Sequence, residues 1–514
     1  MTQGIARRVA RNTAWFTIGS VLQKMISFGY FTVVAMAFGN AGTGEYFFAL
    51  AFTALFAVAA DWGIAPVLTR EIAKDPTGGR AMIVPAFLLK CCFAVLTAGA
   101  VTLLARLLGY DGAARGMIAL ATLVMVLDSI HLGLYALLRG IQRVHYEAIG
   151  FVIGQLALTA SGIGILVAVA GLRYDPSVTP VLTTSRTIAL AWLLVPYLAA
   201  SVTNLCIAIV GSAYERVLHV ERRRTLAATW RPLVRMATPF AIAGGLARLY
   251  TYVDTFLMRT ILGAGAIGAI GAYSVAFKIT FAFQFIPLAF MGALYPAMSA
   301  VALRDRAQLP AIFTSALRTL WIIALPIAVS IGMLAHRIVP MLYGAAFRES
   351  IAPLVVLVAA LPFIFANFPA GNLLNAIGKP ILNTKLLGLA TLINVIANVL
   401  LIPRFGALGA AYSALIASVT LFIANLMVVR RHARYRVRAL AEPFARTSAA
   451  CLVMAAGLWM WPLLPLAATI PAGAALYVGA LFALGGIRRA DIRLLRGYFR
   501  APRDATPAAT GASR

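Results

Sequence analysis

Apolar positions along this chain form long runs, which short polar segments and Gly/Pro breaks separate. Each run is about as long as the ~20 helical residues that cross a bilayer core about 30 Å thick. The pattern therefore predicts an all-α integral membrane protein with about fourteen transmembrane helices. We expect them at 12–38, 45–69, 81–108, 117–138, 148–171, 188–211, 233–262, 270–298, 311–334, 351–371, 381–402, 408–429, 445–465 and 469–487.

The composition excludes most other classes of protein. Apolar residues make up 62% of the chain and charged residues 12%, whereas soluble proteins carry about 25% charged residues. A soluble enzyme, a disordered protein and a disulfide scaffold are therefore excluded. The four cysteines lie within apolar runs and lack metal-ligand spacing, so we expect no metal site. No cofactor is expected either.

The basic residues alternate between the two sides that the expected helices define. The net charge is +28, and 32 Lys and Arg residues fall on the side that holds both termini, against eight on the other side. Cytoplasmic segments carry this excess in membrane proteins, so both termini are expected in the cytoplasm. The charge thus reflects topology and attraction to anionic membrane lipid, and no nucleic acid partner is expected.

Two helix pairs resemble each other in spacing. In the first, Lys24 lies 15 residues before Gly39, and a Gly-rich turn there leads into Gly44-Glu45-Tyr46, which opens the next helix. In the second, Arg248 lies 15 residues before Gly263, and a Gly-rich turn there leads into Gly271-Ala272-Tyr273, which opens the next helix. The pairs are six helices apart, which predicts two like-oriented bundles, an arrangement typical of transporters.

Several ordered segments resemble one known family. They are GNAGTGEYFFAL (39–50), DWGIAPVLTREIAKD (61–75), GLARLYTYVDTFLMRTILGAGAIGAIGAYSVAFKI (245–279), MLYGAAFRES (341–350) and NLLNAIGKPILNTKLLGLATLINVIANVLLIPRFGALGAAYSALIAS (372–418). Over about residues 10–430 the chain resembles the O-antigen and lipid-linked oligosaccharide flippases of the multidrug/oligosaccharidyl-lipid/polysaccharide exporter superfamily.

The resemblance implies two pseudo-symmetric six-helix lobes plus two C-terminal helices. The lobes are expected at 1–211 and 233–430, with a basic cytoplasmic linker at 212–232, helices 13 and 14 at 431–487, and a cytoplasmic tail at 488–514. It also implies a flippase in the bacterial inner membrane that moves an undecaprenyl-diphosphate-linked oligosaccharide to the outer leaflet, for polysaccharide or lipopolysaccharide assembly. Partners would be that lipid-linked oligosaccharide, membrane lipid and other polysaccharide-assembly membrane proteins.

Ionisable residues deep in the spans are the candidate functional residues, because burying a charge in a membrane needs a partner or a wet cavity. In the family, helices 1, 2, 7 and 8 line the cavity, and here they carry an excess of cations that suits a diphosphate. The expected substrate-binding residues are Arg248, Lys24, Lys278, Tyr252 and Arg259. The expected ion-coupling or structural residues are Asp254, Asp61, Asp128 and His131.

Several of these residues also have a structural alternative. Asp128 and His131 can form a proton relay or a polar cluster that packs helices of the N-terminal lobe. Arg259 can snorkel to the outer interface, and Arg248 can pair with an acid on a neighbouring helix. Asp254 can face Lys24 or Lys278 across the bundle, either in an ion pair or as a coupling-ion carboxylate. Asparagines such as Asn394 and Asn398, four residues apart, favour interhelical hydrogen bonding.

Two other functions compete with the flippase. A cation-coupled multidrug exporter of the same superfamily would need more membrane carboxylates and fewer cavity cations. A membrane polysaccharide polymerase or ligase would need a long catalytic outer loop, but the longest one, near 172–187, has about 16 residues and no His or paired carboxylates. The sequence also lacks a Gly-rich nucleotide loop. It therefore indicates a transporter and not an enzyme.

The charge asymmetry generates a topology prediction. Reporter tags placed after Arg8, within 216–224 and after Arg503 should all report cytoplasm, and a tag at Asp175 should report periplasm. A periplasmic report from the C-terminal tag would overturn the even number of spans.

Overall fold

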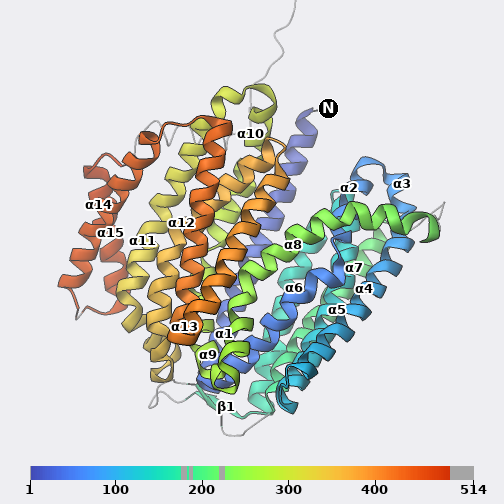
Figure 1. The fold of residues 1–514 in the computed structure, drawn as a ribbon, viewed down its shortest axis with the longest axis horizontal. Helices are drawn as coiled ribbons and strands as arrows, with labels where there is room; N and C mark the ends of the chain where they lie inside the picture. The colour runs from blue at the N-terminus through green and yellow to red at the C-terminus, as the bar shows by residue number, and fades with distance from the viewer. Residues whose placement is uncertain (1, 175–181, 185–188, 219–225, 463, 487–514) are drawn as a thin grey trace, which may run out of the picture.

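The structure is a computed structural model, which describes residues 2–174, 182–184, 189–218, 226–462 and 464–486. Within these ranges it is a bundle of long, roughly parallel helices with one small β-hairpin (Figure 1). The linker residues 219–225, the tail after Gly486 and Asp175 lie outside the described residues.

The elements follow in this order: α1 (Thr2–Asp61), α2 (Ile64–Lys74), α3 (Pro76–Arg80), α4 (Ile83–Leu107), α5 (Gly112–Gly140), α6 (His145–Ala168), β1 (Leu172–Tyr174), β2 (Leu182–Thr184), η1 (Leu190–Leu194), α7 (Val195–Tyr214), α8 (Leu226–Leu262), η2 (Gly263–Gly265), α9 (Ala266–Ala282), α10 (Phe285–Arg304), η3 (Arg306–Gln308), α11 (Leu309–Tyr343), η4 (Ala345–Ser350), α12 (Ile351–Ala376), α13 (Pro380–Ala433), α14 (Arg438–Met460) and α15 (Leu466–Ala483).

Two of the helices are far too long for one membrane crossing, and each contains a glycine at which the chain turns back. α1 has 60 residues and α13 has 54, which at 1.5 Å per residue would be about 80–90 Å. Gly39 in α1 and Gly406 in α13 have φ values of 63° and 53°, a conformation that costs glycine little. In Figure 1, α1 descends from the N-terminus to the opposite end, and the chain then returns to α2.

The membrane fold predicted from the apolar pattern is confirmed. By length and composition, ten helices of the described chain can cross a membrane, and three of these segments, Thr17–Asp61, Ala228–Arg304 and Pro380–Ala433, contain a turn at Gly39, Gly263 or Gly406. α14 is not among the ten. The number fourteen therefore stays a prediction.

Several expected boundaries differ from the observed ones. The span expected at 45–69 breaks at Trp62 and Gly63, which have φ values of 48° and 70°. The span expected at 270–298 breaks between α9 and α10, just before Pro287, because proline has no N–H to donate to the carbonyl of residue 283. α8 begins inside the expected linker, and the expected loop at 172–187 contains the antiparallel β1–β2 pair.

The two ends of the bundle differ in character. We call the end that holds α2, α3 and the α13–α14 turn the basic end, and the end that holds the turn within α1 and the β-hairpin the outer end (Figure 1). α2 and α3 carry Arg70, Lys74 and Arg80, and the α13–α14 turn carries five arginines within residues 430–438.

The two helix pairs that resemble each other in sequence contact each other at the outer end. A Cβ atom on Gly44 would lie 2.0 Å from the carbonyl oxygen of Ile267, and one on Gly271 would lie 1.9 Å from that of Asn40. The contact is reciprocal. Gly44 contacts the backbone of Ile267, four residues before Gly271, and Gly271 contacts the backbone of Asn40, four residues before Gly44. This reciprocal contact brings the backbones of α1 and α9 together, and it gives Gly44 and Gly271 a packing role beyond the turn role expected from sequence.

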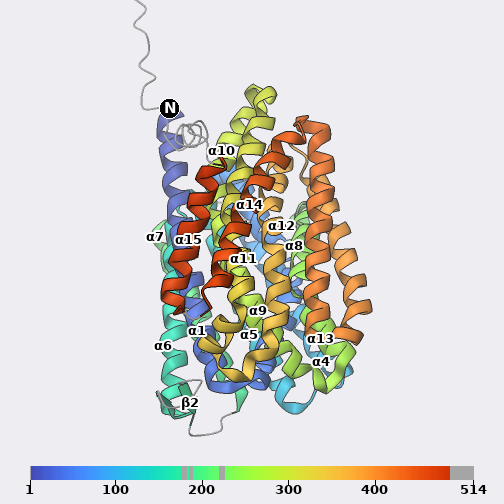
Figure 2. The ribbon, with the colours of Figure 1, turned by 90° about the vertical axis from the view of Figure 1, so that its left-hand side faces the viewer.

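α14 and α15 pack on the outside of α11 (Figure 2). The Tyr477 hydroxyl donates to the Ile322 carbonyl at 2.7 Å, and the Arg446 guanidinium donates to the Gly485 carbonyl at 2.8 Å. The Tyr477 bond, the bonds from Arg318 and Arg337 of α11 to the Gly486 and Leu464 carbonyls, and a small apolar cluster attach the last two helices to α11, whereas the Arg446 bond joins α14 to the end of α15.

The glycine contact generates a stability prediction. Gly44→Ala should destabilise the protein by about 1–3 kcal/mol, because the new methyl group would overlap the Ile267 backbone, which cannot rotate away. The matched control is Gly268→Ala on α9, where a Cβ would have no neighbour within 4 Å. Thermal unfolding in detergent should separate the two variants, and equal melting temperatures would contradict the close backbone contact.

Candidate functional site

Lys24 and Lys278 approach each other where the two halves of the chain meet. Lys24 lies on the first part of α1, Lys278 lies on α9, and both are half-buried. Each is within electrostatic reach of the other, and the Lys278 ammonium lies 5.1 Å from the centroid of the Phe31 ring. Within the described part of the chain neither lysine forms an ion pair. Two cations thus lie close together without a compensating carboxylate.

Arg248 is a third cation on a helix that contacts the N-terminal half, α8. Its side chain is exposed, and its guanidinium is within electrostatic reach of Asp128 on α5. Asp128 accepts a hydrogen bond from the Ser201 hydroxyl at 2.5 Å and lies 3.6 Å from Nδ1 of His131. The acid near Arg248 therefore belongs to the other half of the chain. Asp254, six residues further along α8, is not its partner.

Arg259 has a different environment from Arg248. Only 6% of Arg259 is exposed, and its guanidinium lies 3.9 Å from the Asp111 carboxylate. It also lies over the rings of Phe48 and Tyr110, at 5.8 and 5.7 Å from their centroids. These contacts join α8 to the α1 and α5 helices at the outer end. The structure therefore places Arg259 in a contact between the halves, about 16 Å along the helix from Arg248.

Asp61 is held in a buried ion pair. Its carboxylate accepts from the ammonium of Lys90, a residue of α4 that is 1% exposed. Gly133 makes room for this lysine, since a Cβ there would lie 2.9 Å from Cε of Lys90. The pair is internal to the N-terminal half, so the structure groups Asp61 with Lys90 and not with the cations of α8 and α9.

Asp254 lies among neutral polar side chains. It is 3% exposed and accepts hydrogen bonds from the Tyr273 hydroxyl at 2.6 Å and from the Asn398 amide at 2.7 Å. The same amide donates to Oδ1 of Asn394 at 2.9 Å. The Asn398 oxygen is buried and has no hydrogen-bond partner among the described residues. Carboxylate and amide oxygens are ligands that suit hard cations.

Asp254, Tyr273 and Asn394 of this cluster line a cavity of about 360 Å³ within the C-terminal half. This cavity was not predicted from the sequence, although the asparagines within 367–398, several of which line it, could have indicated it. Its other polar wall residues include Tyr250, Gln284, Asn367, Asn372, Asn375 and Ser418. Tyr252, two residues from Tyr250, instead packs near Phe277, with ring centroids 6.3 Å apart.

Comparison with known proteins agrees with this architecture. Residues 9–302 match the family model described as polysaccharide biosynthesis protein. The chain is 20% identical over 428 residues, which is 83% of each protein, to the probable low-salt glycan biosynthesis flippase Agl15 of Haloferax volcanii.

Two solved structures share the fold at low identity. The lipid II flippase MurJ, in an inward closed conformation, aligns with a TM-score of 0.67 and 14% identity over 93% of this chain and 99% of its own. A point mutant of the Vibrio cholerae MATE transporter VcmN aligns with a TM-score of 0.58 and 14% identity over 84% and 98%. These relationships indicate a transporter and not an enzyme. The chain is a multi-pass membrane protein that belongs to the polysaccharide biosynthesis protein family and has the fold of these transporters.

Proposed function

We propose that this protein flips an undecaprenyl-diphosphate-linked oligosaccharide from the inner to the outer leaflet of the bacterial cytoplasmic membrane. The observation that carries the proposal is the approach of Lys24 and Lys278, with Arg248 as the third cation. Family membership and the resemblance to a glycan flippase and a lipid II flippase support the same substrate class.

A diphosphate needs such a site, because moving an unpaired anion out of water is prohibitively costly. Lysine and arginine compensate phosphate charge through charge-assisted hydrogen bonds, and arginine can do so with two donors at once. Lys24 and Lys278 lack an acidic partner in the described chain, so the substrate would relieve their mutual repulsion. When the substrate binds, the Arg248 guanidinium would interact with its phosphate in place of the Asp128 carboxylate.

Alternating access would be achieved by movement of the lobes 1–211 and 233–430 about the linker 212–232. In the present conformation the halves touch at the outer end through Gly44, Gly271 and Arg259. We infer that substrate enters from the basic end, which we place in the cytoplasm with both termini. Opening would then require that the Arg259–Asp111 contact and the glycine contact separate.

We also propose that the cavity around Asp254 binds a coupling monovalent cation. Asp254 and Asn394 line the cavity and supply oxygen atoms, and the buried oxygen of Asn398 beside them has no hydrogen-bond partner in the described chain. Asp128 and His131 are the second candidate for coupling, through a proton. A cation-coupled multidrug exporter is the alternative function that the Asp254 carboxylate in this cavity favours, but Lys24 and Lys278, which form no ion pair in the described chain, disfavour it.

The substrate role predicts a specific response at Arg248. Arg248→Ala should lower the transport rate about 10- to 100-fold, since a hydrogen bond to a charged group is worth about 1.5–3 kcal/mol. Arg248→Lys should retain partial activity because a point charge still attracts phosphate. The measurement is movement of labelled undecaprenyl-diphosphate oligosaccharide between leaflets of proteoliposomes.

Arg235→Ala is the matched control, since Arg235 is exposed on the same helix near the basic end. Amount of folded protein and thermal stability are measured in parallel. Full transport by Arg248→Ala would refute the binding role. Transport lost only in proportion to folded protein would assign Arg248 a structural role.

The coupling role predicts that Asp254→Asn transports substrate without dependence on the ion gradient. The amide has the shape of the carboxylate and can still accept from Tyr273, so the fold should persist. Transport is measured with and without sodium and proton gradients, beside Asp128→Asn and His131→Ala. If Asp254→Asn depends on the gradient as the wild type does, the Asp254 proposal is wrong. If gradient dependence is lost only in Asp128→Asn and His131→Ala, coupling belongs to Asp128 and His131.

A further inference from the structure

A groove of about 600 Å³ separates the second part of α13 from α14, near the basic end. Of the helices that line it in the described chain, only α12 and α13 also line the cavity around Asp254, and α11 and α12 contribute Trp321 and Phe363 to its lining. Lining residues include Trp321, Phe363, Phe422, Leu426, Arg430 and Phe444. The groove is apolar over most of its length and has one charged end.

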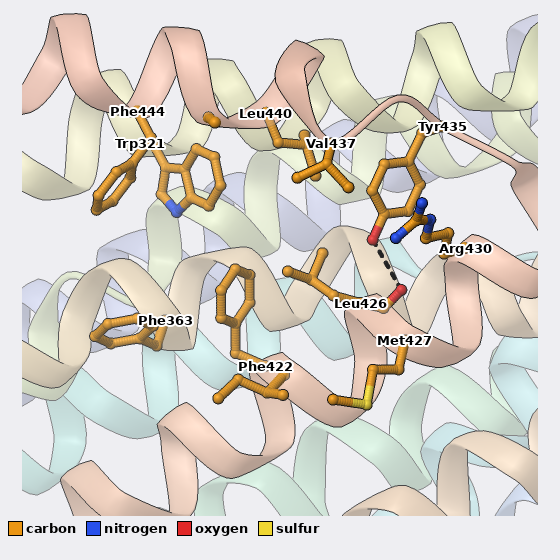
Figure 3. Close-up of a pocket in the computed structure, with 12 residues that line it drawn as sticks. Trp321, Phe363, Phe422, Leu426, Met427, Arg430, Tyr435, Val437, Leu440 and Phe444 are labelled. Carbon is orange, nitrogen blue, oxygen red and sulfur yellow. Dashed lines mark hydrogen bonds between the residues drawn. The ribbon is translucent and has the colours of Figure 1, made fainter.

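The apolar part is a wall of interlocking aromatic rings. The ring of Trp321 lies 5.9 Å from that of Phe422 and 5.1 Å from that of Phe444, and Phe363 lies 5.6 Å from Phe422. Figure 3 shows these rings at one end of the groove, with α14 above them and α13 below. Since the rings brace one another, the groove is a formed surface and does not depend on a ligand to shape it.

The other end of the groove carries Arg430 and Tyr435 (Figure 3). The Tyr435 hydroxyl donates to the Leu426 carbonyl at 2.8 Å, which holds the turn between α13 and α14 against the end of α13. This turn is strongly basic, because residues 430–438 contain five arginines and no acid. The nearest acid along α14, Glu442, is paired with Arg446 at 2.7 Å. Arg430 itself is exposed.

We propose that this groove binds one anionic phospholipid from the membrane leaflet at the basic end. Its acyl chain lies on the aromatic wall, and its phosphate lies beside Arg430. The combination of an apolar groove in the membrane and a basic end at headgroup level fits this ligand on both counts, because basic pockets between transmembrane helices bind anionic headgroups. Phospholipid is also the molecule that the bilayer presents to this surface at the highest concentration.

The lipid would complete the attachment of the last two helices. α14 packs on α11 through a small apolar cluster, and the groove leaves a gap between α14 and α13. An acyl chain in that gap contacts both helices at once. The proposal does not depend on the transported substrate, since the groove lies apart from Lys24, Lys278 and Arg248.

The test is binding of lipids to the purified full-length protein. Phosphatidylglycerol should raise the melting temperature in detergent more than phosphatidylethanolamine does. Arg430→Gln should weaken phosphatidylglycerol binding about fivefold, the loss of one cation beside an anionic lipid. Ala441→Trp, which fills the groove from α14, should abolish the stabilisation. Arg431→Gln is the matched control, because Arg431 is adjacent and exposed but does not line the groove.

A second readout is independent of stability. In a variant that keeps Trp321 and replaces the other tryptophans by Phe, phosphatidylglycerol with brominated acyl chains should quench Trp321 fluorescence, and Arg430→Gln should reduce this quenching. Equal effects of the two lipids, or equal effects of Arg430→Gln and Arg431→Gln, would overturn the proposal. Stabilisation through Arg430 by undecaprenyl phosphate and not by phosphatidylglycerol would also overturn it, and would assign the groove to the polyprenyl chain.

Discussion

The cost of holding a charge inside a membrane is the constraint on which this structure depends. Each such charge needs a partner or water, and most of the buried ones have a partner within the chain. Asp61 pairs with Lys90, Arg259 with Asp111, and Asp254 accepts hydrogen bonds from Tyr273 and Asn398. Against this background Lys24 and Lys278 stand out, because they are half-buried cations that lie near each other and form no ion pair in the described chain.

The polar contacts fall into two groups: those within one half of the molecule and those between the halves. The Asp61–Lys90 pair is internal to the N-terminal half, and the Asp254 cluster is internal to the C-terminal half, so both can persist while the halves move. The Arg259–Asp111 contact joins the halves at the outer end, and it must separate if that end opens. The unpaired cations lie where the halves face each other. A substrate diphosphate bound there would contact both halves, which would couple its binding to their relative position.

Much of the fold could be predicted from the sequence, because a bilayer constrains both the length of a span and the charge of the loops that flank it. The apolar pattern predicted the helices, and the spacing around Gly39 and Gly263 predicted turns that have the same φ of 63°. The turn at Trp62 was missed, since apolar residues continue on both sides of 61–63. The reciprocal contact of Gly44 and Gly271 depends on residues more than 200 positions apart, so spacing within one pair could not reveal it.

The candidate site was predicted less completely than the fold. Sequence alone located the ionisable residues but not their pairing, which depends on the rotation of each helix. It therefore grouped Asp61 and Arg259 with the cavity charges, whereas the structure gives them Lys90 and Asp111 as partners. Asn394 and Asn398 were interpreted as interhelical hydrogen-bonding residues, and they do bond to each other and to Asp254. What periodicity could not indicate is that Asp254 and Asn394 also line a cavity.

The central claim is that Lys24 and Lys278 recognise the diphosphate, and lipid binding to the purified protein tests it most directly. The affinity for undecaprenyl-diphosphate oligosaccharide is compared with that for the same oligosaccharide on a neutral undecaprenyl carrier, in the wild type and in the Lys24→Gln, Lys278→Gln double variant. The account predicts that the wild type prefers the diphosphate lipid and that the double variant, although folded, loses most of this preference. A preference that is unchanged in the double variant, or absent from the wild type, would contradict it.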